Sequence, residues 1–300
     1  MLVFLNGKFI PEEQATVSVF DRSFCLGDGL FEAIPVYNGK TFLWKQHFHR
    51  LQAGADFLTI KMPFSSEAMA SFAEQLLQEN QARENILRIQ LSRGVGLRGY
   101  STKGANSPTL VMSLHPSKRY SSPAKIITSS VRILTNDPLA SFKSCSKISH
   151  VIARMEADEQ GADDAVLLNS DGYVAETTSA NLFWIEQGTV CTPPVQSGAL
   201  PGVTRAMVQA LCQKHGLPIS EKNIGQQLLL QTDGVFITSV AVEVREVSSL
   251  DGRDLARSPL TRILQEAFSD YVKSAHQNGG IAFSGSQFAS GNKPLWARLK

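Results

Sequence analysis

The sequence predicts an α+β protein built from two domains, and three observations support this prediction. The chain has 300 residues, which at the usual domain size corresponds to about two domains. Its first half contains strand pairs joined by tight turns with a helix or two, and its second half mixes strands with helices. Between the halves, residues 116–124 combine prolines, serines and charges without an apolar period, which is typical of a linker.

The first half is expected to contain hairpins, a helix and further strands. Asn6-Gly7 and Asn38-Gly39 are flanked by strand formers, and Asn-Gly is the strongest short-range signal for a type I′ turn. Behind Ser65, which can cap a first turn, apolar residues follow helical spacing. Residues 85–93 alternate between apolar and polar side chains and 107–115 form an apolar run, so both are predicted strands.

The second half is expected to alternate strands and helices. One helix is predicted to open at about Val203, after Pro201-Gly202, and to stop at Gly216, because glycine commonly follows a helix end. The other predicted elements are strands over 126–133, 165–169, 181–186 and 235–239, a turn at Asp171-Gly172, a helix carrying Ile148, Val151, Ile152 and Met155, and a capped terminal helix over 258–272.

These elements define the predicted domain limits. The first domain is expected over residues 1–115 and the second over 125–278, with the linker at 116–124 between them. Residues 279–300 are rich in glycine and serine and are expected to form a loosely ordered tail.

Composition argues against several classes of function. The 29 Lys and Arg against 27 Asp and Glu leave a net charge of +2, too small for a dominant nucleic-acid-binding surface. No stretch approaches the roughly 20 apolar residues of a membrane span, and the N-terminal run lacks the features of a signal peptide. The four cysteines lie far apart without a CxxC pair, so we expect a reducing cytoplasm, no zinc site and no disulfide framework. The histidines lack metal-binding spacing and are expected at the surface or at helix caps.

Three places in the sequence could carry chemistry. At 200–205, LPGVTR puts Gly202 directly before a helix whose first turn, with Val203 and Thr204, could bind an anion such as phosphate; taken alone, the pattern is more often simple helix punctuation. Lys143 lies among small and apolar residues that could lower its pKa and make its amine nucleophilic, or it is an ordinary loop lysine. Glu176 follows a strand and precedes small hydroxyl residues that leave room for a flat ligand, or it is a solvated strand-end carboxylate.

Several spaced motifs together resemble the class IV aminotransferases. That family comprises pyridoxal-phosphate enzymes of fold type IV: branched-chain and D-amino-acid aminotransferases and 4-amino-4-deoxychorismate lyases. The resemblance extends over about residues 2–250, and several motifs in the same order are far more specific than any one. The motifs are GDGLFEA (27–33), HFHRL (47–51), RGVGLRGYS (93–101), FKS (142–144), the run over 154–185 and LPGVTR.

The resemblance implies a cofactor, pyridoxal 5'-phosphate, and roles for the candidate residues. Lys143 falls where the family has the lysine that forms the internal aldimine and later moves protons at the substrate α-carbon. Lys147, the competing lysine, is given a supporting role. Glu176 occupies the position of the carboxylate that holds the pyridine nitrogen protonated. Arg50 matches the arginine that binds the cofactor phosphate together with the backbone at Val203 and Thr204, so that the phosphate is gripped from two domains.

Some positions depart from the family pattern. Pro35 replaces an arginine that follows the first motif, and Ser146 replaces an asparagine three positions after the lysine. On the strand near 239, the family's phosphate-binding threonine is replaced by Val240, so Ser239 is expected to substitute or phosphate binding to be weaker.

The same resemblance leaves the reaction open between lysis and amino transfer. The 93–101 motif, Lys147 and Val240 favour a 4-amino-4-deoxychorismate lyase, which would release p-aminobenzoate and pyruvate and belong to folate biosynthesis. The alternatives are a branched-chain or D-amino-acid aminotransferase with a 2-oxo acid acceptor, an amine transaminase, and a family member that binds the cofactor without turnover. The expected substrates are small amino and keto acids, and a homodimer is expected because the family builds its site at a dimer interface. The implied substrate-binding residues are Phe31, Arg88, Arg98, Tyr100 and Ala241.

Overall fold

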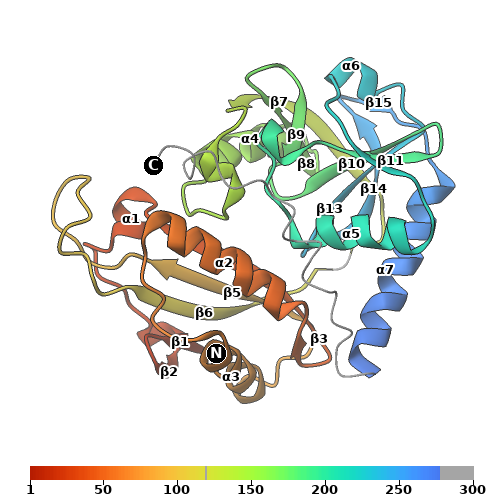
Figure 1. The fold of residues 1–300 in the computed structure, drawn as a ribbon. Helices are drawn as coiled ribbons and strands as arrows, with labels where there is room; N and C mark the ends of the chain where they lie inside the picture. The colour runs from red at the N-terminus through yellow and green to blue at the C-terminus, as the bar shows by residue number, and fades with distance from the viewer. Residues whose placement is uncertain (119, 278–300) are drawn as a thin grey trace. The chain divides into compact units, whose positions relative to one another are not determined.

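The structure, a computed structural model, describes residues 1–118 and 120–277 (Figure 1). The chain forms two compact units. The first comprises Met1–Arg119 and Phe142–Ile148, and the second comprises Tyr120–Ser141 and the chain from Ser149 onward. The tail expected over 279–300 lies outside the described residues.

The first unit is built on a six-stranded antiparallel sheet with the strand order β2-β1-β6-β5-β3-β4. Its elements are β1 (Leu2–Leu5), β2 (Lys8–Pro11), η1 (Glu12–Gln14), α1 (Arg22–Leu26), β3 (Gly29–Tyr37), β4 (Lys40–Thr41), α2 (Trp44–Leu58), α3 (Ser66–Glu79), β5 (Asn85–Ser92) and β6 (Thr109–Pro116).

The predicted turns and the first capped helix are confirmed. The turns of the β1–β2 and β3–β4 hairpins fall at Asn6-Gly7 and Asn38-Gly39, and all four residues have positive φ, as a type I′ turn requires. The side chain of Ser65 accepts a hydrogen bond from the N–H of Ala68 at the start of α3.

One face of this sheet packs on α2 and α3, which lie along it in Figure 1. β5 alternates as predicted, with Leu87, Ile89 and Leu91 buried in the core formed with the two helices. Arg88 and Gln90 therefore point to the opposite face. That opposite face carries polar and charged groups of the candidate site.

The second unit is built on nine strands ordered β12-β11-β10-β13-β14-β7-β8-β9, with β15 beside β14. Because β9 pairs with both β8 and β10, six of these strands close into a barrel. Its elements are β7 (Ala124–Ile133), η2 (Pro138–Ser141), α4 (Ile148–Glu159), β8 (Asp164–Asn169), β9 (Val174–Thr177), β10 (Asn181–Glu186), β11 (Thr189–Thr192), η3 (Val195–Ser197), α5 (Val203–Lys214), β12 (Ile219–Glu221), α6 (Gln226–Leu229), β13 (Gly234–Ser239), β14 (Glu243–Leu250), β15 (Arg253–Asp254) and α7 (Pro259–Gln277).

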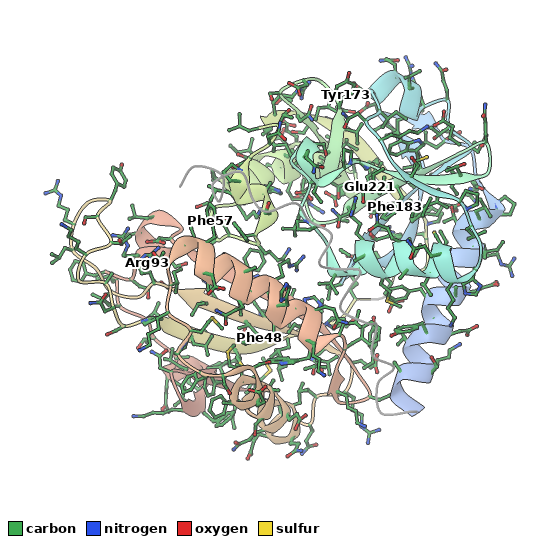
Figure 2. The ribbon with its side chains drawn as sticks, in the orientation of Figure 1. Phe48, Phe57, Arg93, Tyr173, Phe183 and Glu221 are labelled. Carbon is green, nitrogen blue, oxygen red and sulfur yellow. The ribbon has the colours of Figure 1, made fainter. Side chains whose placement is uncertain are left out.

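The core of the second unit is strongly apolar. Phe183 on β10, labelled in Figure 2, stacks on Phe236 of β13 with ring centroids 4.9 Å apart, and both side chains are fully buried. α5 begins at Val203 as predicted, and Gly216 follows its end with φ +67°. The core therefore fixes the ends of β10, β13 and α5, where the second group of candidate residues lies.

Candidate active site

The predicted site residues fall into two groups, one in each unit. In the first unit, Phe31, Arg50, Arg88 and Lys143 gather around the N-terminal half of β3. In the second unit, the residues lie at the ends of β9 and β13 and at the start of α5: Glu176, Gly202, Val203, Thr204 and Ser239. Val240 and Ala241 lie in the turn between β13 and β14, and Arg98 and Tyr100 lie in an exposed loop of the first unit.

Lys143 is held against the edge of β3, although it follows the linker in the sequence. Its carbonyl accepts a hydrogen bond from the N–H of Phe31 at 2.8 Å, and the N–H of Cys145 donates to the carbonyl of Gly29 at 2.9 Å. The segment thus pairs with β3 like a short antiparallel strand. The Lys143 Nζ lies 4.8 Å from the centroid of the Phe31 ring. These backbone hydrogen bonds therefore fix where the Lys143 side chain begins.

Arg88 approaches the same aromatic ring. Its guanidinium carbon lies 4.2 Å from the Phe31 centroid, and the arginine is half-buried on the face of the sheet opposite α2 and α3. Burial lowers the pKa of Arg88, but a guanidinium keeps its charge at neutral pH. A cation held against the same ring as Lys143 is suited to bind a substrate carboxylate.

Sequence reasoning missed a buried cluster of Glu32, His47 and Arg50. Arg50 donates from Nε and Nη2 to the two Glu32 carboxylate oxygens at 2.7 Å each, and His47 Nδ1 lies 2.8 Å from Glu32 Oε2. The side chains of Glu32 and His47 are each only 1% exposed. The expectation that the histidines lie at the surface or at caps is therefore wrong for His47. The signal was available, because Glu32 lies in GDGLFEA, and His47 and Arg50 in HFHRL.

The charge states in this cluster follow from their surroundings. Burial would raise the pKa of Glu32, but the Arg50 charge and the hydrogen bonds of Arg50 and His47 lower it to about 2. Burial lowers the pKa of His47 below its ordinary value in spite of Glu32, so the ring is neutral at pH 7. Because a carboxylate only accepts hydrogen bonds, His47 Nδ1 carries the proton and donates it to Glu32.

In the second unit, Glu176 belongs to a row of polar residues that crosses three strands. Glu176 on β9 is opposite Asn181 on β10, which is opposite Thr238 on β13. Cross-strand partners point to the same face of a sheet, so the three side chains lie side by side. All three residues are at least nine-tenths buried. Asn181 and Thr238 were not among the predicted site residues.

The row is tied to the loop that precedes α5. The N–H of Leu200 donates to Glu176 Oε2 at 2.9 Å, and the Asn181 side-chain amide donates to the Leu200 carbonyl at 2.7 Å. A Cβ atom at Gly202 would lie 2.0 Å from Asn181 Oδ1, so a side chain there would have to displace Asn181 or the start of α5. The Glu176 carboxylate and the start of α5 are thus fixed relative to each other.

This corner of the second unit has the features of an anion site. Val203 and Thr204 form the first turn of α5, where N–H groups have no acceptor within the helix. The hydroxyls of Thr238 and Ser239 are buried and have no hydrogen-bond partner within residues 1–118 and 120–277. Buried hydroxyls are rarely left unsatisfied, so a ligand with acceptor oxygens fits this place. Val240 has no hydroxyl, so its side chain donates no hydrogen bond at this place.

His150 on α4 is a second residue that sequence reasoning missed. Its Nε2 lies 3.3 Å from Glu176 Oε1, and its side chain is 17% exposed. Nε2 is the donor in this contact, since a carboxylate can only accept. The surface or capping role expected for the histidines is therefore wrong for His150 too, and both oxygens of Glu176 are held.

Arg98 and Tyr100 lie apart from the first-unit group, on an exposed loop that is anchored at its base. The buried Arg22 donates to the carbonyls of Gly99, Tyr100 and Ser101 at 3.0–3.2 Å. Asp28 receives hydrogen bonds from both Arg22 and Arg93, the latter labelled in Figure 2. Tyr100 is 88% exposed, so the loop presents its side chains outward from a fixed backbone.

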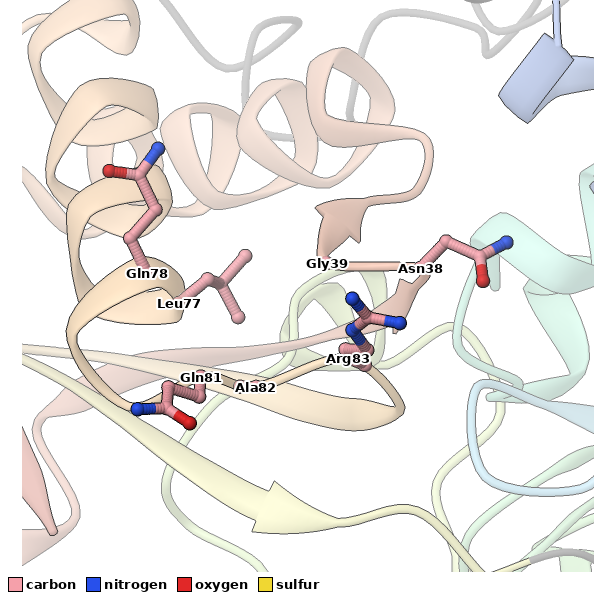
Figure 3. A pocket seen from close by; sticks show the side chains of 7 residues that line it. All are labelled: Asn38, Gly39, Leu77, Gln78, Gln81, Ala82 and Arg83. Carbon is pink, nitrogen blue, oxygen red and sulfur yellow. The ribbon is translucent and has the colours of Figure 1, made fainter.

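A cavity of about 550 Å³ elsewhere in the first unit is not the candidate site. It lies beside the end of α3 and the β3–β4 turn, and Figure 3 shows its lining. The lining residues offer amides and one guanidinium but no carboxylate, hydroxyl or amine for acid–base chemistry. They are Asn38, Gly39, Leu77, Gln78, Gln81, Ala82 and Arg83.

No helix within residues 1–118 and 120–277 is both long and apolar enough to span a membrane.

The comparisons with known proteins agree with these motifs. The family model for class IV amino-transferases matches residues 29–250. A candidate branched-chain-amino-acid aminotransferase of Methanocaldococcus jannaschii is 35% identical over 276 residues, which cover 90% of this chain and 96% of the relative. The D-alanine aminotransferase of Bacillus licheniformis is 32% identical over 281 residues, covering 91% of this chain and 98% of the relative.

Solved structures share the fold. The T.th. branched-chain amino acid aminotransferase with pyridoxamine 5'-phosphate has a TM-score of 0.87 at 27% identity, covering 94% of this chain and 98% of that one. A candidate 4-amino-4-deoxychorismate lyase from Legionella pneumophila has a TM-score of 0.82 at 30% identity, covering 86% and 96%. The predicted two-domain α+β fold of the fold type IV enzymes is confirmed. The chain belongs to the class IV aminotransferase family.

Proposed function

We propose that the protein is a pyridoxal-phosphate-dependent amino-acid aminotransferase that uses a 2-oxo acid as acceptor. The observation that carries this proposal is the placement of Lys143 on the edge of β3, with Arg88 against the same Phe31 ring. An amine and a carboxylate-binding cation held against one aromatic ring suit a reaction at an amino-acid α-carbon. Two relatives at 35% and 32% identity, both named as aminotransferases, support the same reaction.

The residues present fit this cofactor. The start of α5 and the unpartnered hydroxyls of Thr238 and Ser239 suit its phosphate, and the doubly held Glu176 carboxylate suits its pyridine nitrogen. When bound, pyridoxal phosphate supplies a reactive aldehyde and a ring that withdraws electrons from the substrate α-carbon.

Each catalytic side chain then has a defined task. Lys143 would hold the cofactor through its amine; once the substrate amine has displaced it, the freed amine would take the proton from the substrate α-carbon and deliver it to the carbon of the cofactor's aldehyde group. Glu176 holds a proton on the pyridine nitrogen by charge. Arg50 binds phosphate oxygens, and Arg88 binds a substrate carboxylate. Phe31 and Ala241 complete the proposed substrate contacts, together with Arg98 and Tyr100, whose exposed loop would reach the pocket of the second copy in the proposed homodimer.

The second candidate is 4-amino-4-deoxychorismate lysis to p-aminobenzoate and pyruvate. Tyr100 stands where the D-amino-acid enzymes have a histidine, and Ile86 where the branched-chain enzymes have a tyrosine. Lys147 and Val240 also favour the lyase, as does the likeness to the Legionella pneumophila structure. Both reactions need the same Lys143 and Glu176, so these residues do not separate them.

A substrate panel separates the two reactions. The purified enzyme is given D- and L-amino acids with pyruvate or 2-oxoglutarate, and in parallel aminodeoxychorismate without any keto acid. Amino transfer without p-aminobenzoate release is the expected result. Release of p-aminobenzoate and pyruvate without an acceptor, in the absence of amino transfer, would contradict the proposal in favour of the lyase.

We also propose that the protein is a homodimer. Exposed apolar side chains of the first unit gather where the 17–24 segment and the 93–101 loop are joined by the Gly96 N–H to Phe20 carbonyl bond. Along α4, Val151, Ile152 and Met155 are 45–56% exposed. Grouped apolar side chains on a surface favour a protein partner, and the family's dimer supplies one. Light scattering should give a mass near 65 kDa, twice the 32.7 kDa chain; a monomer would contradict this.

A further inference from the structure

Glu32 pairs with Arg50 through two hydrogen bonds, yet neither the family motifs nor the proposed mechanism gave it a role. It lies on β3 and is 1% exposed, whereas Arg50 lies on α2. The carboxylate receives two hydrogen bonds from the guanidinium at 2.7 Å each and a third from His47 at 2.8 Å. Such a two-point pairing fixes both the direction and the rotation of a planar guanidinium.

This pairing determines which part of Arg50 can meet a phosphate. A guanidinium has five N–H bonds, and Glu32 uses two of them. Glu32 thereby sets the direction in which the rest of the guanidinium faces. The edge formed by Nε and Nη2 already faces a protein carboxylate rather than the ligand.

The same strand also holds the candidate catalytic lysine. Phe31, the neighbour of Glu32, donates its backbone N–H to the Lys143 carbonyl at 2.8 Å. Two consecutive residues of β3 therefore hold Arg50 through a side chain and Lys143 through the backbone. The spacing between the two groups is set by one rigid strand and does not depend on a loop.

We propose that Glu32 is a positioning residue that aims Arg50 at the cofactor phosphate, in register with Lys143. This inference rests on the proposed function, in which Arg50 binds that phosphate. The competing role for Glu32 is simple neutralisation of the buried Arg50 charge. The two roles predict opposite effects of removing the carboxylate. If Glu32 orients Arg50, phosphate binding becomes weaker, whereas if Glu32 only neutralises Arg50, the loss of a nearby negative charge makes phosphate binding stronger.

Glu32→Gln and Glu32→Asp separate these roles. The Gln amide presents N–H donors to the guanidinium donors, so the two-point pairing is lost along with the charge. Asp keeps the charge but is one methylene shorter, so it cannot span the same gap without moving Arg50. Asp28→Asn is the matched control, because it also breaks a carboxylate pairing with two arginines in the first unit, away from Arg50.

The measurement is the dissociation constant of the full-length apoprotein for pyridoxal phosphate and for pyridoxal, which lacks the phosphate. Both Glu32 variants should weaken pyridoxal phosphate binding by about tenfold or more, as expected for charged hydrogen bonds to a misaligned donor. Pyridoxal binding should not change, and Asp28→Asn should keep the wild-type ratio of the two constants. A purely structural role would weaken both ligands together.

Each other outcome overturns the inference. An unchanged or tighter pyridoxal phosphate affinity in Glu32→Gln shows charge neutralisation. If that variant does not fold, a wild-type ratio of the two dissociation constants in Glu32→Asp shows charge neutralisation instead. Wild-type protein that binds neither ligand would instead contradict the proposed function, and the inference with it.

Discussion

At the scale of single residues, Glu176 shows how the structure prepares a side chain for its task. Leu200 and His150 hold one carboxylate oxygen each, and the residue is buried in a row with Asn181 and Thr238. Holding both oxygens restricts the carboxylate to one orientation before any ligand arrives.

Replacing Glu176 with Gln should separate binding from turnover. The amide has nearly the same shape but cannot keep a proton on the pyridine nitrogen by charge. We expect the borohydride-fixed adduct with pyridoxal phosphate to form as in the wild type, while kcat falls by at least about 100-fold. Absorbance titration and steady-state kinetics give both readouts. Full activity in this variant would mean that a residue other than Glu176 pairs with the pyridine nitrogen.

At the scale of elements, the loop before α5 depends on a glycine. Gly202 precedes the helix, and a Cβ there would lie 2.0 Å from Asn181 Oδ1, which itself belongs to the row that contains Glu176. A substitution must therefore move either the Asn181 side chain or the first turn of α5.

Gly202→Ala should weaken pyridoxal phosphate binding by about tenfold, because the first-turn N–H groups no longer point at the same place. Gly225 is the matched control, since no atom lies within 4 Å of a Cβ built there, so Gly225→Ala should bind like the wild type. Equilibrium titration of the apoprotein measures both. Equal affinity of the two variants would mean that α5 does not contribute to the phosphate site.

The elements also show what the sequence could predict. The hairpin turns and α3 were predictable because Asn-Gly and a capping Ser65 act locally. α2 has no such signal, since Leu43 precedes it in a left-handed conformation without a side-chain cap. The polar row could not be predicted for a different reason: Glu176, Asn181 and Thr238 meet through strand register, which local sequence does not encode. Lys143 and Glu176 were predicted as site residues from the family motifs and not from a local structural signal.

At the scale of the whole molecule, the chain returns to the first unit for residues 142–148 after it has entered the second. This return places Lys143 on β3 in the first unit, whereas Glu176 belongs to the second unit. The buried charges of the first unit make its stability sensitive to acid.

Acid should destabilise the first unit through Glu32. Its pKa is about 2 in the folded protein against an ordinary 4.5, so the unfolded chain takes up the proton first. The resulting stabilisation, about 3 kcal/mol, is fully present above pH 4.5 and is lost as the pH falls towards 2. In urea titrations, Glu32→Gln should show a shallower loss of unfolding free energy across this range. A slope equal to that of the wild type would contradict the charge state assigned to Glu32.

The central claim is that Lys143 is the residue that binds pyridoxal phosphate covalently. Its most direct test is borohydride reduction of the cofactor-loaded protein, followed by peptide mass mapping, with Lys143→Ala and Lys147→Ala in parallel. We expect a pyridoxyl mass on the peptide with Lys143 modified, its loss in Lys143→Ala and its retention in Lys147→Ala. A modified Lys147, or an adduct that persists undiminished in Lys143→Ala, would contradict the account.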